Sequence, residues 1–223
     1  MTNQPRRVLV SGFEPFGGLS WNPSAEVAEA VAGRADSRLL TAQDEHDEVA
    51  VEAVVLPVEF QTAGQLLLDA VKKHRPDLVI CLGLAAGTDT VRLERVGLNL
   101  RDARIADNAG AQPLGEAIVE GAPNAYFSTL RLKAAHQRIA ADGVPVSLSL
   151  SAGTYVCNEV LYTLLHHIET EQLAVAAGFL HIPDLRGHAP ALTLDQATAA
   201  LDLTISESLQ AGPDAAAASG ALH

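Results

Sequence analysis

The strongest candidate for chemistry in this sequence is Cys157, which lies where small residues separate an apolar strand from a helix. Residues 151–158 read Ser-Ala-Gly-Thr-Tyr-Val-Cys-Asn, and this order places the cysteine in the first turn of the helix. Unpaired N–H groups and the positive end of the helix dipole stabilise a thiolate at such a position. The pattern predicts a nucleophilic cysteine with a lowered pKa. From position alone, a cysteine that merely fills the core is the alternative.

The second cysteine, Cys81, lies inside the apolar run 78–82 and is predicted to be a buried core residue. An apolar environment on both faces would raise the pKa of its thiol and deny access to solvent. In a reducing cytosol both cysteines are expected to be free thiols, so the two need separate explanations.

A nucleophilic cysteine needs a base, and His181 is the best placed of eight histidines. It follows the apolar run 173–180 and precedes Ile182-Pro183, where the chain leaves the sheet. Open α/β sheets build their sites beyond the carboxyl ends of strands, and the turn before Cys157 is expected at the same edge. A hydrogen-bonded structural histidine is the alternative. Other histidines lie on polar stretches, near a helix end or at the chain end: His46, His74, His136, His166, His167 and His223.

Glu94 is the candidate acid that would hold the imidazole in one tautomer. In the segment 91–100, a period of two places this carboxylate on the same side as Val96 and Leu98. A carboxylate among apolar residues is a candidate for a buried partner of the histidine. A surface ion pair with Arg92 or Arg95 is the alternative.

Apolar runs of strand length alternate with stretches of helical period, which predicts an α/β fold with helices on both faces of a largely parallel sheet. We expect strands at 7–12, 49–58, 77–83, 144–150 and 173–180, and helices at 61–74, 128–141, 154–168 and 194–209, with Ser128 and Thr154 as caps. Residues 1–210 are expected to form one domain. Residues 211–223 are Ala-rich and are predicted to be a flexible tail.

Composition limits the partners and the location that we expect. The chain has 15 Lys and Arg against 27 Asp and Glu, a net charge of −12 that opposes binding to a phosphate backbone, so nucleic acid is not expected. No apolar run approaches the roughly 20 residues of a membrane span, and the first residues lack a signal-peptide pattern. A cytoplasmic protein that binds no membrane is therefore expected.

Four ordered motifs together resemble the pyroglutamyl peptidase I family, also called pyrrolidone carboxyl peptidase. Residues 8–18 read Val-Leu-Val-Ser-Gly-Phe-Glu-Pro-Phe-Gly-Gly and are followed by Asn-Pro-Ser at 22–24. Glu-Arg-Val at 94–96 precedes Asp-Ala-Arg-Ile at 102–105 and Asp-Asn at 107–108. The third motif is the segment around Cys157, and the fourth is Gly-Phe-Leu-His-Ile-Pro at 178–183.

The resemblance implies a cysteine peptidase with an α/β/α sandwich that hydrolyses the amide bond after an N-terminal pyroglutamate through a covalent acyl-enzyme. It implies that residues 1–210 are the catalytic domain, with Glu94, Cys157 and His181 as the catalytic set. It also implies a homotetramer without metal or organic cofactor. Positions that match a substrate pocket are Phe13, Phe16, Asn22, Leu84, Arg104, Ile105, Tyr155 and Val156.

The sequence departs from the family pattern at the expected pocket. Where the family usually reads Gly-Gln-Ala-Gly-Gly-Arg, residues 83–88 read Gly-Leu-Ala-Ala-Gly-Thr, so Leu84 and Thr88 replace a glutamine and an arginine. Leu150 replaces a common asparagine. Tyr155 replaces a common phenylalanine, and its hydroxyl needs a ligand or another partner. An altered acyl preference or weakened activity would follow.

Two alternative functions fit parts of this sequence. A repurposed relative would keep the scaffold and bind a lactam or a peptide N-terminus without hydrolysis, as Leu84 and Thr88 suggest. A phosphate or nucleotide binder is suggested by the glycines between Gly12 and Gly18 after a strand. That segment lacks the Lys-Ser/Thr ending of a P-loop and the spacing of a dinucleotide fingerprint, which argues against the second alternative.

Overall fold

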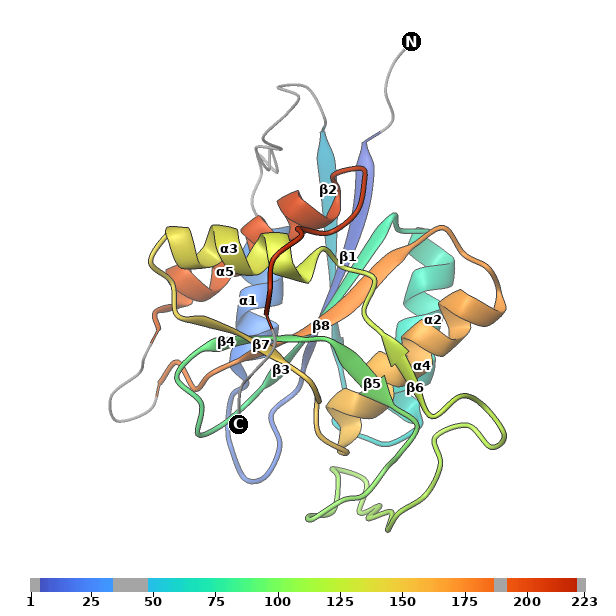
Figure 1. The fold of residues 1–223 in the computed structure, drawn as a ribbon. Coiled ribbons are helices and arrows are strands. Elements are labelled where there is room, and N and C mark those ends of the chain that lie inside the picture. Colours follow the sequence, from blue (N-terminus) through green and yellow to red (C-terminus); the bar gives the residue numbers. More distant parts are fainter. Residues whose placement is uncertain (1–4, 34–47, 187–191, 220–223) are drawn as a thin grey trace.

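The computed structural model describes residues 5–33, 48–186 and 192–219 and has three layers, with a twisted sheet between two sets of helices (Figure 1). Six strands form the main sheet in the order β2-β1-β3-β8-β4-β7. Their bounds are β1 Arg6–Phe13, β2 Val49–Leu56, β3 Leu78–Leu84, β4 Val91–Glu94, β7 Val146–Ser149 and β8 Ala176–Ile182. A separate antiparallel pair consists of β5 (Val96–Leu98) and β6 (Ala125–Phe127). The predicted α/β/α sandwich is confirmed.

Helices cover both faces of the main sheet (Figure 1). One face carries α1 (Pro23–Ala32), α3 (Leu132–Ala141) and α5 (Leu194–Ser208), and the other carries α2 (Thr62–His74) and α4 (Val156–Thr170). In the part of the chain that the structure describes, no helix is long and apolar enough to cross a membrane.

Strand β3 is apolar throughout because it is buried on both faces. Its residues Leu78, Ile80 and Leu82 belong to the core under α1, α3 and α5. The alternate residues Val79 and Cys81 belong to the core under α2 and α4. The face that carries Cys81 is therefore also the face on which α4 packs.

Strand direction differs from the prediction at one place that affects the site. Strands β2, β1, β3 and β8 run parallel, but β4 pairs antiparallel with β8, and β7 runs parallel to β4. The mostly parallel sheet is confirmed. The turn before Cys157 is expected at the carboxyl edge of the histidine strand. The strand β7 that leads into this turn points opposite to β8, but Cys157 still lies over Gly83, near the carboxyl end of β3. Residues 150–155 carry the chain from the end of β7 to the start of α4.

Two helices begin later than predicted, because the expected cap residues bind elsewhere. The hydroxyl of Ser128 donates to the carbonyl of Ala177, and α3 begins only at Leu132. The hydroxyl of Thr154 donates to the carbonyl of Asp102, and the residue after it is the N-cap of α4. Both side chains join neighbouring segments to each other and do not cap helices.

Helix α1 is absent from the sequence prediction, although its capping residue belongs to a recognised motif. The side chain of Asn22 accepts a hydrogen bond from the backbone N–H of Ser24, which satisfies a free donor of the first turn. Gly12 allows that turn to approach β1 closely, since a Cβ there would lie 2.6 Å from the Cα of Ala25. The backbone N–H of Phe13 then donates to the hydroxyl of Ser24 over 3.0 Å. This packing brings Phe13 and Asn22 together.

The described part of the Ala-rich tail, residues 211–219, makes specific contacts that its composition does not predict. Both carboxylate oxygens of Asp214 accept hydrogen bonds from the first turn of α3, from the backbone N–H groups of Lys133 and Ala134. The ammonium of Lys133 also donates to the carbonyl of Ala217 over 2.9 Å. Asp214 thus supplies the acceptor that α3 lacks at its own N-cap. The last residues of the predicted tail, 220–223, lie outside the described residues.

Candidate active site

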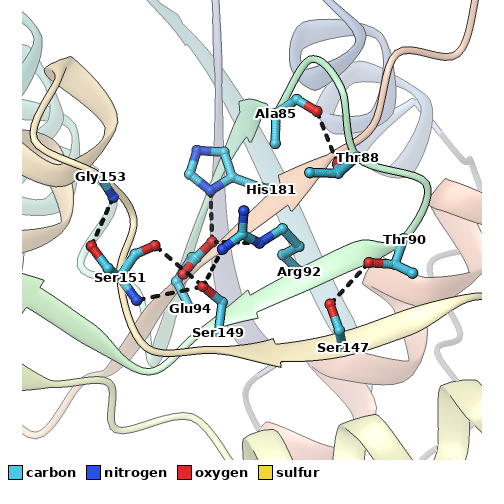
Figure 2. Close-up of polar contacts among 10 residues, drawn as sticks. All are labelled: Ala85, Thr88, Thr90, Arg92, Glu94, Ser147, Ser149, Ser151, Gly153 and His181. Carbon is cyan, nitrogen blue, oxygen red and sulfur yellow. Dashed lines mark hydrogen bonds and ion pairs between the residues drawn. The ribbon is translucent and has the colours of Figure 1, made fainter. Parts of the chain in front are cut away.

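His181 and Glu94 form a buried pair across the antiparallel strands β8 and β4. In the register, Glu94 lies opposite Phe179 and Arg92 lies opposite His181, so the imidazole and the carboxylate are diagonal neighbours on one face. The Nδ1 atom of His181 lies 2.8 Å from Oε1 of Glu94 (Figure 2). An ionised carboxylate can only accept, so Nδ1 carries the proton and Nε2 is left as the basic atom. The pair has the geometry of a base and the acid that orients it.

The carboxylate of Glu94 is fully buried, and its surroundings explain how it stays there. Arg92 places its Nε 3.7 Å from Oε1 of Glu94 and donates through Nη2 to the hydroxyl of Ser149 over 2.7 Å (Figure 2). The other carboxylate oxygen, Oε2, has no hydrogen-bond partner among the residues that the structure describes. The alternative that the sequence left open, an ion pair between Arg92 and Glu94, is therefore present, but this contact is longer than the one between His181 and Glu94, and the carboxylate is buried. The prediction that Glu94 and Val96 lie on the same side of one strand is wrong, because β4 ends at Glu94 and Val96 begins β5.

Cys157 occupies the second position of α4, in the first helical turn, in agreement with the sequence prediction. Its sulfur lies over Gly83 of β3, where a Cβ would fall 2.8 Å from Sγ. Gly83 is the register partner of His181 in the adjacent parallel strand. A glycine is required here, because any side chain at this position would occupy the space of the sulfur. The thiol therefore lies above the sheet beside the histidine strand, although no sequence pattern singles out Gly83.

The pKa of the Cys157 thiol is raised to about 12, opposite to the direction predicted from the helix dipole. Burial is the largest cause, and the charges of Glu94 and Cys81 add to it, while a hydrogen bond from its own backbone N–H opposes them. Desolvation disfavours a thiolate more strongly than one turn of a helix favours it. The resting form of this cysteine is the thiol. A thiolate at this position would need a nearby base to take the proton.

Cys81 behaves as predicted. It is fully buried, and burial raises the pKa of its thiol to about 12, against a lowering from a hydrogen bond with Ser11. Its side chain has no exposed surface, whereas Cys157 keeps partial exposure. The pKa of each thiol is raised to about 12, so the two cysteines differ in their exposure and not in their pKa.

None of the other described histidines forms a hydrogen bond or an ion pair with His181 or Glu94. His166 contacts the hydroxyl of Tyr126 through Nδ1 over 2.9 Å and stacks on the ring of Tyr162, which is a structural role. His46 and His223 lie outside the described residues. Among the residues that are described, no group of three or more His, Cys, Asp or Glu side chains could hold a metal ion.

A small cavity lies beside the sulfur of Cys157, with an empty volume of about 210 Å³. Six of the eight predicted pocket residues line it, together with Cys157 and with Val58, which sequence reasoning missed: Phe13, Phe16, Asn22, Leu84, Tyr155 and Val156. The other two predicted residues, Arg104 and Ile105, are exposed and lie outside this lining. The volume includes space that is open to solvent, so the lining residues describe this cavity better than its size does.

The polar side chains in the described lining of the cavity are mostly bound to other groups. Asn22 is the one amide among them, and its Nδ2 donates to the carbonyl of Glu14 while its Oδ1 accepts from Ser24. Tyr155 has a hydroxyl, but this group donates to the carbonyl of Ala106 over 3.1 Å. This carbonyl is the hydrogen-bond partner that the extra hydroxyl needs. The remaining lining side chains, Cys157 apart, are apolar. A ligand here contacts an apolar wall and must find its hydrogen bonds on the backbone.

Two departures from the family pattern, Thr88 and Leu150, do not belong to the lining of the cavity. The hydroxyl of Thr88 donates to the carbonyl of Ala85 and closes the turn that follows β3 (Figure 2). Leu150 is 63% exposed, and it precedes the turn in which the hydroxyl of Ser151 accepts from the N–H of Gly153. Among the departures, Leu84 and Tyr155 line the cavity.

The mixed α/β sheet carries a buried imidazole and carboxylate, and the strand next to the imidazole lies under a cysteine at the start of a helix. This arrangement is compatible with a cysteine peptidase. Comparison with known proteins identifies the family within this class. The model of the family described as pyroglutamyl peptidase matches residues 6–216. This chain belongs to the pyroglutamyl peptidase family.

The relatives agree in sequence and in structure. The pyrrolidone-carboxylate peptidase of Streptomyces coelicolor is 46% identical over 177 residues, which cover 79% of this chain and 77% of the relative. That of Bacillus amyloliquefaciens is 36% identical and covers 98% of this chain and 99% of the relative. A crystal structure of pyroglutamyl peptidase I from the same species superposes with a TM-score of 0.83 at 36% identity and covers 93% of this chain and 97% of its own. The pyrrolidone carboxyl peptidase of Thermococcus litoralis gives a TM-score of 0.81 at 35% identity, covering 92% and 93%.

The raised pKa of Cys157 predicts that its reactivity depends on His181. In the wild type at pH 7, iodoacetamide should modify Cys157 because the imidazole accepts the thiol proton. In His181→Gln the rate at pH 7 should fall sharply and then rise roughly tenfold per pH unit up to about pH 10, as the thiol ionises unaided. Mass spectrometry of the modified peptides measures both rates.

Cys81 is the internal control for this experiment, because its thiol is buried and should stay unmodified in the folded protein. Equal alkylation rates at pH 7 in the wild type and in His181→Gln would contradict proton transfer from sulfur to imidazole.

Proposed function

We propose that this protein hydrolyses the amide bond that follows an N-terminal pyroglutamyl residue, with Cys157 as nucleophile, His181 as base and Glu94 as the acid that orients the base. The observation that carries the proposal is the 2.8 Å contact between the imidazole of His181 and the buried carboxylate of Glu94. His181 pairs in register with Gly83 of the adjacent strand, and Gly83 lies under the sulfur of Cys157. Relatives that cover nearly the whole chain are named for this activity. The small apolar cavity beside the sulfur suits the acyl group.

The first half of the reaction forms a thioester. The Cys157 thiol gives its proton to Nε2 of His181, and the sulfur attacks the carbonyl carbon of the pyroglutamyl residue. The carbonyl oxygen becomes an oxyanion. His181 then returns the proton to the nitrogen of the leaving peptide, the C–N bond breaks, and the pyroglutamyl group stays on sulfur.

The second half releases pyroglutamate. Neutral His181 takes a proton from water, the hydroxide attacks the thioester carbon, and the C–S bond breaks with return of the proton to Cys157. The backbone N–H of Cys157 is a suitable donor to the oxyanion in both halves, because the first N–H groups of α4 have no partner within the helix. Glu94 carries no proton in this cycle and stabilises the imidazolium.

The cavity also supports a preference for a blocked N-terminus. Pyroglutamate is a neutral lactam, whereas an ordinary N-terminal residue carries an ammonium ion that loses its hydration in an apolar cavity. Among the described lining residues there is no carboxylate to compensate such a charge. A prolyl residue has a ring of the same size, but its secondary amine is charged. Selection by charge is therefore expected to exclude proline.

We also propose that residues 1–210 are the catalytic domain and that the protein forms a homotetramer in the cytoplasm, as the resemblance to the family implies. Large apolar side chains that are exposed in the single chain support association between copies, among them Leu114 at 75% exposure and Phe127 of β6 at 69%. Light scattering of the purified protein measures the assembly, and a monomeric mass would contradict it.

Substitution of Cys157 or of Glu94 should strongly lower the rate of hydrolysis of a pyroglutamyl coumarin amide under reducing conditions. We expect Cys157→Ser to lower kcat by at least about 10³-fold, because a hydroxyl is a far weaker nucleophile than a thiol. Glu94→Gln should lower kcat by about 10²- to 10⁴-fold, because the amide does not hold the required tautomer. Release of coumarin fluorescence measures both.

Cys81→Ala serves as the control and should keep kcat, since Cys81 has no part in the reaction. Wild-type protein that binds the amide without hydrolysing it would instead favour the repurposed relative, in which the scaffold binds a lactam but performs no chemistry.

Leu84 should limit how well the enzyme distinguishes a lactam from an apolar ring. An apolar wall discriminates weakly against an isosteric analogue, whereas a side chain that hydrogen-bonds the lactam rejects an analogue without it. Leu84→Gln should therefore raise the ratio of kcat/KM for pyroglutamyl over cyclopentanecarbonyl coumarin amide by about tenfold or more.

Leu84→Met is the matched apolar control and should leave that ratio unchanged. A wild type that already rejects the cyclopentane ring completely would show that backbone groups alone read the lactam, against the proposed role of Leu84.

A further inference from the structure

A segment made of residues 98–108 lies across the first turn of the nucleophile helix; we call it the strap. Asn158 follows Cys157 directly and binds the strap at three points. Its Nδ2 donates to the carbonyls of Leu98 and Leu100, and its Oδ1 accepts from the N–H of Leu98, each over 2.9 Å. The strap is therefore attached to the helix turn that carries the sulfur.

The far end of the strap contacts the loops that supply the cavity wall. The carboxylate of Asp107 accepts from the N–H of Phe60 over 2.8 Å, at the loop between β2 and α2. The side chain of Asn108 donates to the carbonyl of Pro15 over 3.0 Å, at the loop between β1 and α1. Movement of the strap would thus move the nucleophile turn and the cavity wall relative to each other.

A buried ion pair lies at the middle of this attachment. Nη2 of Arg101, on the strap, donates to Oε1 of Glu159, on α4, over 3.0 Å, and both side chains are almost completely buried. The same Oε1 accepts from the backbone N–H of Gln61 over 3.0 Å, immediately before α2. Glu159 therefore joins the strap, the nucleophile helix and the start of α2 at one atom.

We propose that Arg101 and Glu159 are positioning residues, and that their buried pair holds the strap on α4 so that the Cys157 thiol faces His181 and the cavity. Neither residue lines the cavity, and both act through the strap and the helix turn. The part of this inference that concerns turnover rests on the proposed function. The part that concerns the thiol does not, because sulfur reactivity is measurable without a substrate.

The charge balance at Glu159 makes the two residues strongly interdependent. Burial raises the pKa of Glu159, and the charge of Asp107 adds to this, while the Arg101 guanidinium and the Gln61 N–H oppose it. Loss of Arg101 alone leaves a buried carboxylate without its cation, which disrupts more than the loss of both charges. The effects of the two substitutions should therefore be far from additive.

Single and double variants of the full chain test the proposal. Arg101→Gln should lower both the rate of Cys157 alkylation and kcat for the pyroglutamyl coumarin amide by at least about tenfold, since small displacements of reacting groups cost large factors in rate. The double variant Arg101→Gln/Glu159→Gln should recover much of this loss, because it leaves no unpaired charge. Arg101→Lys should lower both rates less than Arg101→Gln does, because lysine keeps the positive charge but lacks the paired donor geometry of a guanidinium.

Arg131→Gln is the matched control for general destabilisation. Arg131 is also partly buried, and it joins the start of α3 to the end of α5 by donating to the carbonyl of Glu207 and the side chain of Gln210, on the opposite side of the sheet. This substitution should lower the Tm while leaving alkylation and kcat unchanged. If Arg101→Gln lowers only the Tm, or if Arg131→Gln slows alkylation as much, the pair is merely structural and the proposal is overturned.

Two further arms keep the outcome decisive. Should Arg101→Gln fail to fold, Glu159→Gln makes the same test, because its amide oxygen can still accept from Gln61. Should the wild type hydrolyse no pyroglutamyl amide, the proposed function fails, yet the alkylation rates still support or overturn the positioning role.

Discussion

The contact between His181 and the buried carboxylate of Glu94 is the interaction on which the rest of the site depends. A carboxylate is costly to bury without a partner, and the diagonal position across β8 and β4 supplies one. That position exists only because β4 runs antiparallel to β8, so the reversal of strand direction within the sheet is part of the site. Arg92, two residues before Glu94 in β4, approaches the same oxygen and limits the cost of burying the charge.

The sulfur is placed by a second constraint, the lack of a side chain at Gly83. Because the thiol packs where a Cβ would be, α4 can approach the sheet closely enough for its first turn to meet the histidine strand. The closeness that aligns the thiol also desolvates it, and the pKa of Cys157 rises to about 12. In the proposed mechanism, ionisation and attack are therefore coupled to the imidazole. A protonated and desolvated thiol is also less readily oxidised than a free thiolate.

Sequence patterns correctly predict those features of this structure that depend on residues close together in the chain. The apolar run of β3 correctly indicates burial on both faces and identifies Cys81 as a core residue. The directions of β4 and β7 are not predictable in this way, because a strand has the same side-chain pattern in either direction. The pKa of Cys157 is predicted in the wrong direction, since the sequence shows the helix start but not the atoms packed against it. Gly83, Val58 and the pair of Arg101 and Glu159 escape sequence reasoning for the same reason: each depends on contacts between segments far apart in the chain.

The tautomer of His181 in the reduced, substrate-free enzyme tests the central claim most directly. Nitrogen-15 NMR of histidine-labelled protein distinguishes the two ring nitrogens, and His181→Gln assigns the signals. The account predicts that neutral His181 carries its proton on Nδ1, directed at Glu94, and that Nε2 is unprotonated and ready to accept from the thiol. A proton on Nε2, or a ring that averages between both tautomers, would contradict the proposed pairing of acid, base and nucleophile.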